Sequence, residues 1–173
     1  MIATMQQQWD MSGRTVVITG GNSGIGLEAA VDLARMGASV TITARNPDRG
    51  AAALDEVRRR SGSPDVSVVA LDLASLASVR AAADELLATR EHIHVLINNA
   101  GAILSSRTLT ADGFEATLGA NHLGHHLLTN LLMDRLVTSA PARVVNVASL
   151  AHRAAWRGMS WDDLDRSLSL IHI

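Results

Sequence analysis

The chain has 173 residues, enough for one domain with a sizeable core. Its 47% apolar content argues against disorder, and its net charge of −2 gives no electrostatic reason to expect nucleic acid or an anionic membrane as partner. Cysteine is absent, which excludes disulfides and thiol chemistry, and the first residues lack the apolar run of a signal peptide. No stretch approaches the roughly 18 apolar residues of a membrane span. We therefore expect a cytoplasmic protein.

Short apolar, β-branched runs alternate along the chain with longer segments of helical spacing. Strands are predicted at 15–19, 39–43, 66–71, 95–97 and 144–148, and helices at 25–36, 48–60, 76–89 and 110–138. Gly37 is placed to end the first helix, Pro47 to open the second and Ser75 to cap the third. The strand runs are continuously apolar, which indicates burial on both faces. The pattern predicts an α/β protein with a doubly wound (Rossmann) parallel sheet of about five strands.

The segment "TGGNSGIG", 19–26, follows the first strand and opens directly into a helix. Glycines at this spacing permit a sharp turn, close approach of a pyrophosphate and close helix–strand packing, while amides at the helix N-terminus meet phosphate charge. The expected cofactor-binding residues of this turn are Thr19, Gly20, Asn22, Ser23, Gly24, Ile25 and Gly26. A flexible turn without a ligand is the alternative. No G-K-[ST] follows, which argues against a P-loop NTPase.

The second strand is followed by Ala44 and Arg45. Dinucleotide-binding folds that prefer NAD commonly place an acidic residue here for the ribose hydroxyls. The planar guanidinium of Arg45 could instead pair with a 2′-phosphate. The sequence therefore favours NADP over NAD as cofactor, and a solvated arginine at a strand end is the alternative.

Taken together, these motifs resemble the short-chain dehydrogenase/reductase family in its classical form. "TGGNSGIG" matches the family's TGxxxGIG, and "NNAG" at 98–101 matches its second fingerprint. The resemblance implies that Asp72 and Leu73 contact the adenine, and that Asn99, Ala100 and Gly101 belong to the cofactor site. The sequence of residues 121–152 is most similar to the branch of the family that includes retinol-dehydrogenase-like proteins. The match runs from about Trp9 to Asp165.

The same resemblance implies two catalytic residues, Ser149 and Asn121. In the family the serine hydroxyl binds the substrate oxygen, and a tyrosine exchanges the proton while hydride passes to or from the nicotinamide. Free tyrosine has a pKa of about 10, and a lysine four residues later lowers it. Asn121 would support that lysine through a water. The sequence contains neither tyrosine nor lysine. We therefore interpret the chain as an N-terminal fragment, inactive as given.

Three segments are expected: an N-terminal extension at 1–13, an incomplete NAD(P)-binding Rossmann domain at 14–167, and a non-native tail at 168–173. The tail, "LSLIHI", fits nothing in the family, and it corresponds to one translation frame of a sequencing-library adapter. An authentic apolar tail is the alternative.

The leading functional hypothesis is an NADP-dependent oxidoreductase whose substrate is a small-molecule alcohol, aldehyde or ketone. A non-catalytic NADP-binding or redox-sensor module on the same fold is the alternative, and an S-adenosylmethionine methyltransferase is a more distant one. No metal site is expected, because His122, His125 and His126 lack the H-E-x-x-H pattern and are interpreted as packing or surface histidines. The resemblance also implies that the full-length parent can form a homo-oligomer.

Overall fold

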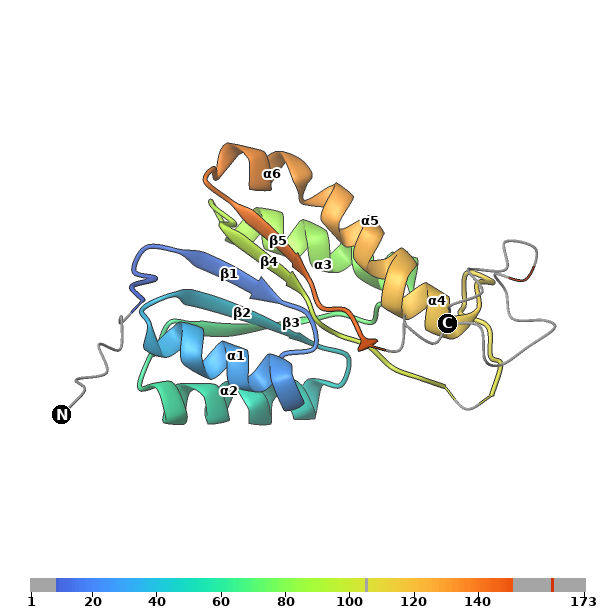
Figure 1. The fold of residues 1–173 in the computed structure, drawn as a ribbon, viewed down its shortest axis with the longest axis horizontal. Coiled ribbons are helices and arrows are strands. Elements are labelled where there is room, and N and C mark those ends of the chain that lie inside the picture. The colour runs from blue at the N-terminus through green and yellow to red at the C-terminus, as the bar shows by residue number, and fades with distance from the viewer. Residues whose placement is uncertain (1–8, 105, 151–162, 164–173) are drawn as a thin grey trace.

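The computed structural model describes residues 9–104, 106–150 and 163. Most of the predicted N-terminal extension and the whole predicted tail, 168–173, lie outside the described residues. The described chain forms one parallel sheet with the strand order β3-β2-β1-β4-β5 (Figure 1). Its strands are β1 (Thr15–Ile18), β2 (Ser39–Ala44), β3 (Val66–Ala70), β4 (Val95–Asn98) and β5 (Arg143–Asn146). The prediction of a doubly wound α/β fold is confirmed.

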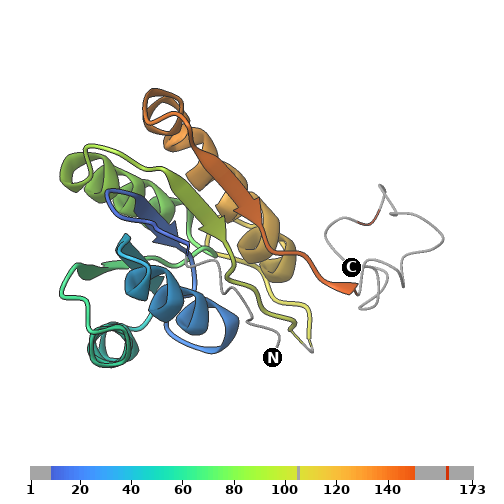
Figure 2. The ribbon, with the colours of Figure 1, turned by 60° about the vertical axis from the view of Figure 1, so that its left-hand side comes forward.

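Helices cover both faces of the sheet (Figures 1 and 2). One face carries α1 (Gly24–Arg35) and α2 (Pro47–Ser61), and the other carries α3 (Leu76–Thr89) and α5 (Gly124–Leu131). Successive strand residues point to opposite faces, so Val16 and Ile18 pack under α1 while Val17 packs under α3 and α5. All three side chains are fully buried. Burial on both faces explains why the strands are continuously apolar.

The local signals at the helix ends act as the sequence predicts. Gly37, with φ of 93°, follows α1 in the left-handed conformation. Pro47 is the first residue of α2, and the side chain of Asn46 accepts a hydrogen bond from the amide of Arg49. Ser75 caps α3 by accepting from the amide of Ser78. These short-range contacts fix where the helices begin and end.

The helix predicted at 110–138 is confirmed from Ala116 onward, but it begins six residues later than predicted and is not regular. Residues 110–115 form a turn, and the helical segment that follows is divided into α4 (Ala116–Leu118), the π-helical η1 (Gly119–Leu123), α5 and α6 (Met133–Thr138). Gly113 takes a φ of 85° in the turn, and the side chain of Glu115 then caps α4. In η1 the amide of Gly124 reaches the carbonyl of Gly119, five residues back, so the ladder is locally widened.

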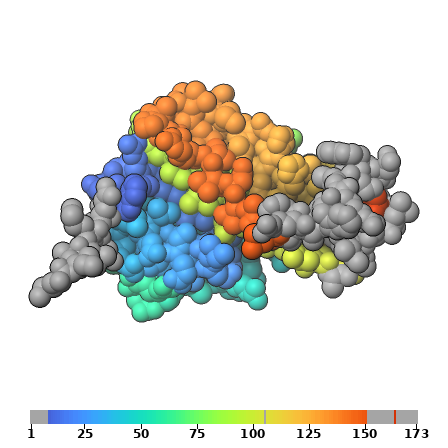
Figure 3. Space-filling view, in the orientation of Figure 1, coloured from blue at the N-terminus to red at the C-terminus, as the bar shows by residue number. Residues whose placement is uncertain are grey.

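The last strand also ends earlier than the predicted 144–148, because β5 stops at Asn146. Among the described residues β5 pairs only with β4. Val144 and Val145 are 40% and 44% exposed, and β5 reaches the molecular surface in the space-filling view (orange, Figure 3). In the described part of the chain, β5 is therefore an apolar edge strand.

Within the same described part, no helix is long and apolar enough to cross a membrane.

Candidate cofactor and active site

Two adjoining cavities open at the carboxyl ends of the strands, where parallel α/β sheets bind their ligands. The turn cavity, of about 430 Å³, is lined by Gly20, Asn22, Ser23, Thr43, Ala44, Arg45, Asn46, Arg49, Leu71, Asp72, Leu73, Asn99, Ala100, Gly101, Ala102 and Ala120. The serine cavity, of about 680 Å³, is lined by Asn98, Asn99, Ala100, Gly101, Ala102, Ile103, Asn121, His122, His125, His126, Thr129, Asn146, Val147, Ala148 and Ser149. The segment 99–102 lines both and forms the wall between them.

The glycine turn after β1 packs directly against this wall. Gly20 has a φ of 66°, and a Cβ placed on it would lie 2.8 Å from the Cβ of Ala100. A Cβ on Gly26 would lie 2.5 Å from both the carbonyl oxygen of Gly20 and the Nδ2 of Asn99. Any side chain at these positions would push the turn and the wall apart, so both contacts require glycine.

The N-terminal end of α1 is open to an anion. Ser23 makes no side-chain capping hydrogen bond, and the first turn carries no acidic residue. By contrast, Asn46 and Ser75 cap α2 and α3 with their side chains. Gly24 opens α1 with a φ of 55°, and nothing lies within 4 Å of where its Cβ would be. The first amides of α1 are thus placed to meet the charge of a phosphate, and the geometry fits a dinucleotide pyrophosphate.

Two arginine side chains line the part of the turn cavity that follows β2. Arg45, predicted from the sequence, is exposed there beside Arg49 of α2. Asp72 lies at the same cavity and accepts a hydrogen bond from the amide of Ala74 with its Oδ1, at 3.0 Å. Two guanidinium groups at one end of the cavity would favour a ligand with an additional phosphate.

Thr19 lies beneath the turn and lines neither cavity. Its fully buried hydroxyl oxygen accepts from the amides of Asn99, at 2.9 Å, and Ala100, at 3.0 Å. The side chain of Asn99 in turn donates to the carbonyl of Thr19 at 3.0 Å. Three hydrogen bonds therefore tie the end of β1 to the wall between the cavities.

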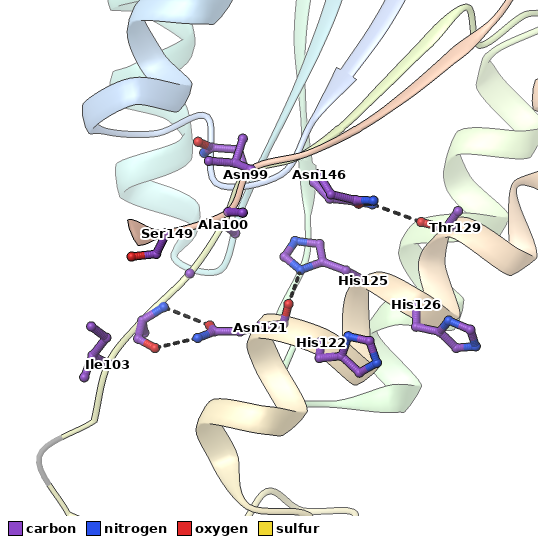
Figure 4. Close-up of a pocket in the computed structure, with 15 residues that line it drawn as sticks. Asn99, Ala100, Ile103, Asn121, His122, His125, His126, Thr129, Asn146 and Ser149 are labelled. Carbon is purple, nitrogen blue, oxygen red and sulfur yellow. Dashed lines mark hydrogen bonds between the residues drawn. The ribbon is translucent and has the colours of Figure 1, made fainter. Parts of the chain in front are cut away.

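Ser149 and Asn121, predicted as catalytic, line the same serine cavity. Asn121 belongs to η1, and its side-chain amide makes two hydrogen bonds with the backbone of Ala102, accepting from the amide at 2.9 Å and donating to the carbonyl at 2.8 Å (Figure 4). Ser149 follows β5 and lies near Ala100 in the same view. The structure thus brings these two residues from distant parts of the chain to one cavity.

The floor of the serine cavity is polar. Asn98 donates from its Nδ2 to the Oδ1 of Asn146, at 2.8 Å, and to the hydroxyl of Thr129, at 3.1 Å. Asn98 is buried, and its Oδ1 has no hydrogen-bond partner. A buried carbonyl oxygen of this kind is suited to accept a hydrogen bond from a water or a ligand.

His125 was interpreted from the sequence as a packing or surface histidine, and it is buried. Its ring lies between Thr19, whose hydroxyl is 2.8 Å from Nε2, and the carbonyl of Asn121, 3.0 Å from Nδ1. Burial lowers the pKa of His125 below its usual value; the hydrogen bond to the carbonyl of Asn121 opposes this by a smaller amount, and the nearby His122 lowers the pKa further. Only the contact with Asn121 could be predicted from the sequence, because residues four apart in a helix lie one turn from each other.

Most of the residues predicted for the cofactor line the turn cavity, namely Gly20, Asn22, Ser23, Arg45, Asp72, Leu73, Asn99, Ala100 and Gly101. Thr19, Gly24, Ile25 and Gly26 line neither cavity; they form or support the turn, and the Ile25 side chain is 74% exposed. Sequence reasoning missed Arg49 and Asn46 in the turn cavity and Asn98 and His125 in the serine cavity. In the described residues, no group of three or more histidine, cysteine, aspartate or glutamate side chains could hold a metal ion.

Comparison with known proteins agrees with this geometry. The family model described as short chain dehydrogenase matches residues 14–161. Human retinol dehydrogenase 12 is 51% identical over 142 residues, and human retinol dehydrogenase 11 is 49% identical over the same length. Each match covers 82% of this chain and 45% of the relative, so the chain spans less than half the length of these relatives.

Solved structures show the same fold. A protein from Mycobacterium paratuberculosis superposes with a TM-score of 0.78 at 40% identity, over 95% of this chain and 57% of the other. The Pseudomonas aeruginosa RhlG/NADP active-site complex gives a TM-score of 0.70 at 30% identity, over 85% of this chain and 59% of the other. The chain therefore belongs to the short-chain dehydrogenase/reductase family of oxidoreductases, in the branch that contains the retinol dehydrogenases.

Proposed function

We propose that this chain supplies the cofactor site of an NADP-dependent oxidoreductase that acts on an alcohol, aldehyde or ketone. The observation that carries the proposal is the pair of adjoining cavities, one at an open helix N-terminus and the other lined by Ser149 and Asn121. A dinucleotide could lie across the shared wall with its phosphates in the turn cavity and its nicotinamide toward the serine cavity.

In this proposal each end of the turn cavity holds a different part of the cofactor. The first amides of α1 hold the pyrophosphate, Asp72 lies at the adenine, and Arg45 with Arg49 takes the 2′-phosphate. NADP is preferred over NAD because the two guanidinium groups have no partner of comparable charge on NAD. The NADP named with the P. aeruginosa structure is consistent with this preference.

The bound cofactor would supply or accept a hydride, and the protein would orient the substrate beside it. The Ser149 hydroxyl is suited to hydrogen-bond a carbonyl or alcohol oxygen, and Asn121 holds the wall at Ala102. Neither a serine hydroxyl nor an asparagine amide is acidic enough to act as the general acid in place of a tyrosine assisted by a lysine. The sequence contains no tyrosine and no lysine. We therefore expect residues 1–173 to bind NADP(H) without turning over a substrate.

The same absence of tyrosine and lysine supports a second candidate, a non-catalytic NADP-binding or redox-sensor module. Both candidates bind NADP in the turn cavity, but only the oxidoreductase binds a substrate in the serine cavity. A pure binding module has no need of a serine and an asparagine at one cavity.

The deciding experiment compares residues 1–173 with a product extended through a native Tyr-x-x-x-Lys segment, using NADPH oxidation with a panel of aldehydes and ketones. We expect no measurable rate for 1–173 and a rate for the extended product that falls about 10²–10⁴-fold in Ser149→Ala. An extended product that binds NADPH and reduces none of the panel would favour the binding module. Carbonyl reduction by 1–173, abolished by Ser149→Ala, would show that the chain is an enzyme as it stands.

A further inference from the structure

His125 is a buried titratable group to which the proposed reaction gives no role. It projects from α5 toward the ends of the strands, whereas the rings of His122 and His126 stack on each other on another side of the helix, with 6.1 Å between their centroids (Figure 4). Its ring is the one contact in the described structure that joins the hydroxyl under the glycine turn to the backbone of Asn121. It therefore links the serine cavity to the threonine that lies under the glycine turn.

Counting donors and acceptors fixes the form of this imidazole. The hydroxyl oxygen of Thr19 accepts two amide protons, from Asn99 and Ala100, which occupies both of its lone pairs. Its single proton must then be donated, and the Nε2 of His125 at 2.8 Å is a closer acceptor than the carbonyl of Ile97 at 3.4 Å. Nε2 therefore carries no hydrogen.

The other ring nitrogen must then be the donor. The carbonyl of Asn121 can only accept, so the Nδ1 of His125 carries the proton that it donates across 3.0 Å. The only neutral tautomer that satisfies all four groups is the Nδ1–H form. A second proton on Nε2 would meet the Thr19 oxygen, and one of the two amides would have to leave it.

The electrostatic surroundings also oppose a second proton. Two other titratable groups line the serine cavity, His122 of η1 and His126 of α5, and both are exposed. The residues at the ends of β1, β4 and β5 that face His125 or the cavity are uncharged: Thr19, Asn98, Asn99 and Asn146. No carboxylate or guanidinium lines this cavity in the described residues. Among the described residues the carbonyl of Asn121 is the one group that raises the pKa of His125, and burial outweighs it.

We propose that His125 is a positioning residue for the cofactor site, which as the neutral Nδ1–H tautomer holds the 99–102 wall at Asn99 and Ala100 through Thr19, so that its protonation weakens dinucleotide binding. The proposal rests on the proposed function, because it assumes that the wall contacts NADP(H). It adds a pH dependence to that site which neither Ser149 nor Arg45 would produce.

The first test reads the tautomer directly in the unsubstituted chain. Correlation of ¹⁵N and ¹H resonances in histidine-labelled protein distinguishes a protonated from an unprotonated ring nitrogen and follows each histidine against pH. We expect His125 to show a protonated Nδ1 and a bare Nε2 at pH 7.5, and to have a pKa below the usual value of histidine. A bare Nδ1, or an imidazolium at pH 7.5, would overturn the proposal.

The second test measures NADPH affinity against pH by fluorescence titration. Below the pKa that NMR reports for His125, the Kd of the unsubstituted chain should rise relative to that of His125→Gln, by at most about tenfold per pH unit. This ratio cancels the titration of the ligand's own phosphate. His92→Gln, an exposed histidine ahead of β4, is the matched control and should keep the full pH dependence.

At pH 7.5, His125→Leu should bind NADPH about fivefold to tenfold more weakly, and His125→Gln, which keeps an amide donor and acceptor, should recover part of the loss. A parallel pH profile in the unsubstituted chain and His125→Gln would overturn the positioning role. If no NADPH binding is measured at any pH, the proposed function is wrong, and so is the role of His125 in cofactor binding. The NMR measurement still shows which tautomer His125 adopts.

Discussion

Replacing Thr19 with valine removes one hydroxyl and keeps the shape of the side chain. In the folded chain that oxygen accepts the amides of Asn99 and Ala100, and its proton reaches His125. Thr19 itself is fully buried, so no water can take over these contacts without a rearrangement. Each amide left without an acceptor costs about 1–2 kcal/mol in a partly buried site. We therefore expect Thr19→Val to lower the free energy of unfolding by about 2–4 kcal/mol.

The loss is measured by urea unfolding followed by circular dichroism at pH 7.5. Thr19→Ser is the matched control, because it keeps the hydroxyl and loses one methyl group, worth about 1 kcal/mol. Thr19→Val should also weaken NADPH binding, whereas Thr19→Ser should not. If valine destabilises the chain no more than serine does, the hydroxyl does not hold the wall and the reasoning is refuted.

Three further results are expected. In Gly26→Ala the new Cβ would lie 2.5 Å from a backbone carbonyl, so the melting temperature should fall by the equivalent of about 1–3 kcal/mol and NADPH binding should be lost. Gly62→Ala, at a φ of 75° with open space around it, should cost about 1–2 kcal/mol and keep NADPH binding; loss of binding in both variants, or in neither, would contradict the close packing at Gly26. Val145→Lys places a charge on the exposed edge strand and should reduce self-association in light scattering and the binding of a hydrophobic dye; unchanged scattering would count against an open edge. Because burial lowers the pKa of His125 below 6.5, the unfolded chain takes up this proton first, so the free energy of unfolding should fall as pH drops below 6.5, by at most about 1.4 kcal/mol per pH unit. Equal urea midpoints at pH 7.5 and 5.5 would contradict that burial.

The parts of the fold that the sequence predicted are those set by short-range signals. The apolar runs form the five strands of the sheet: β1 and β2 are buried between the two helical layers, whereas β5 is exposed at the edge, and Asn46 and Ser75 cap α2 and α3. The glycine turn was predictable for the same reason, since its spacing and the helix after it are contiguous in the chain. Resemblance then supplied Ser149 and Asn121, which the structure places at one cavity.

What the sequence did not predict depends on contacts between distant segments. The helix predicted at 110–138 is divided near Gly124, where a Cβ would collide with the backbone carbonyl of Leu73, some fifty residues earlier. The apolar spacing typical of a helix continues through Gly124, so the sequence does not show that this residue packs closely against Leu73. The contact of His125 with Thr19 spans 106 residues in the same way. Arg49 was not predicted as a site residue, because its position at the turn cavity depends on the direction that α2 takes after β2, and the sequence does not show this direction.

The proposed function requires that the turn cavity binds a dinucleotide and selects it through the charge at Arg45. The most direct measurement is the Kd of residues 1–173 for NADPH and for NADH, in the unsubstituted chain, in Arg45→Asp, and in Arg80→Asp as a matched charge reversal on the exposed face of α3. A charge-assisted contact is worth about 1.5–3 kcal/mol, so NADPH should bind roughly tenfold to 150-fold more tightly than NADH. Arg45→Asp should reverse this preference and Arg80→Asp should keep it. Equal affinities for NADPH and NADH in the unsubstituted chain would contradict the claim.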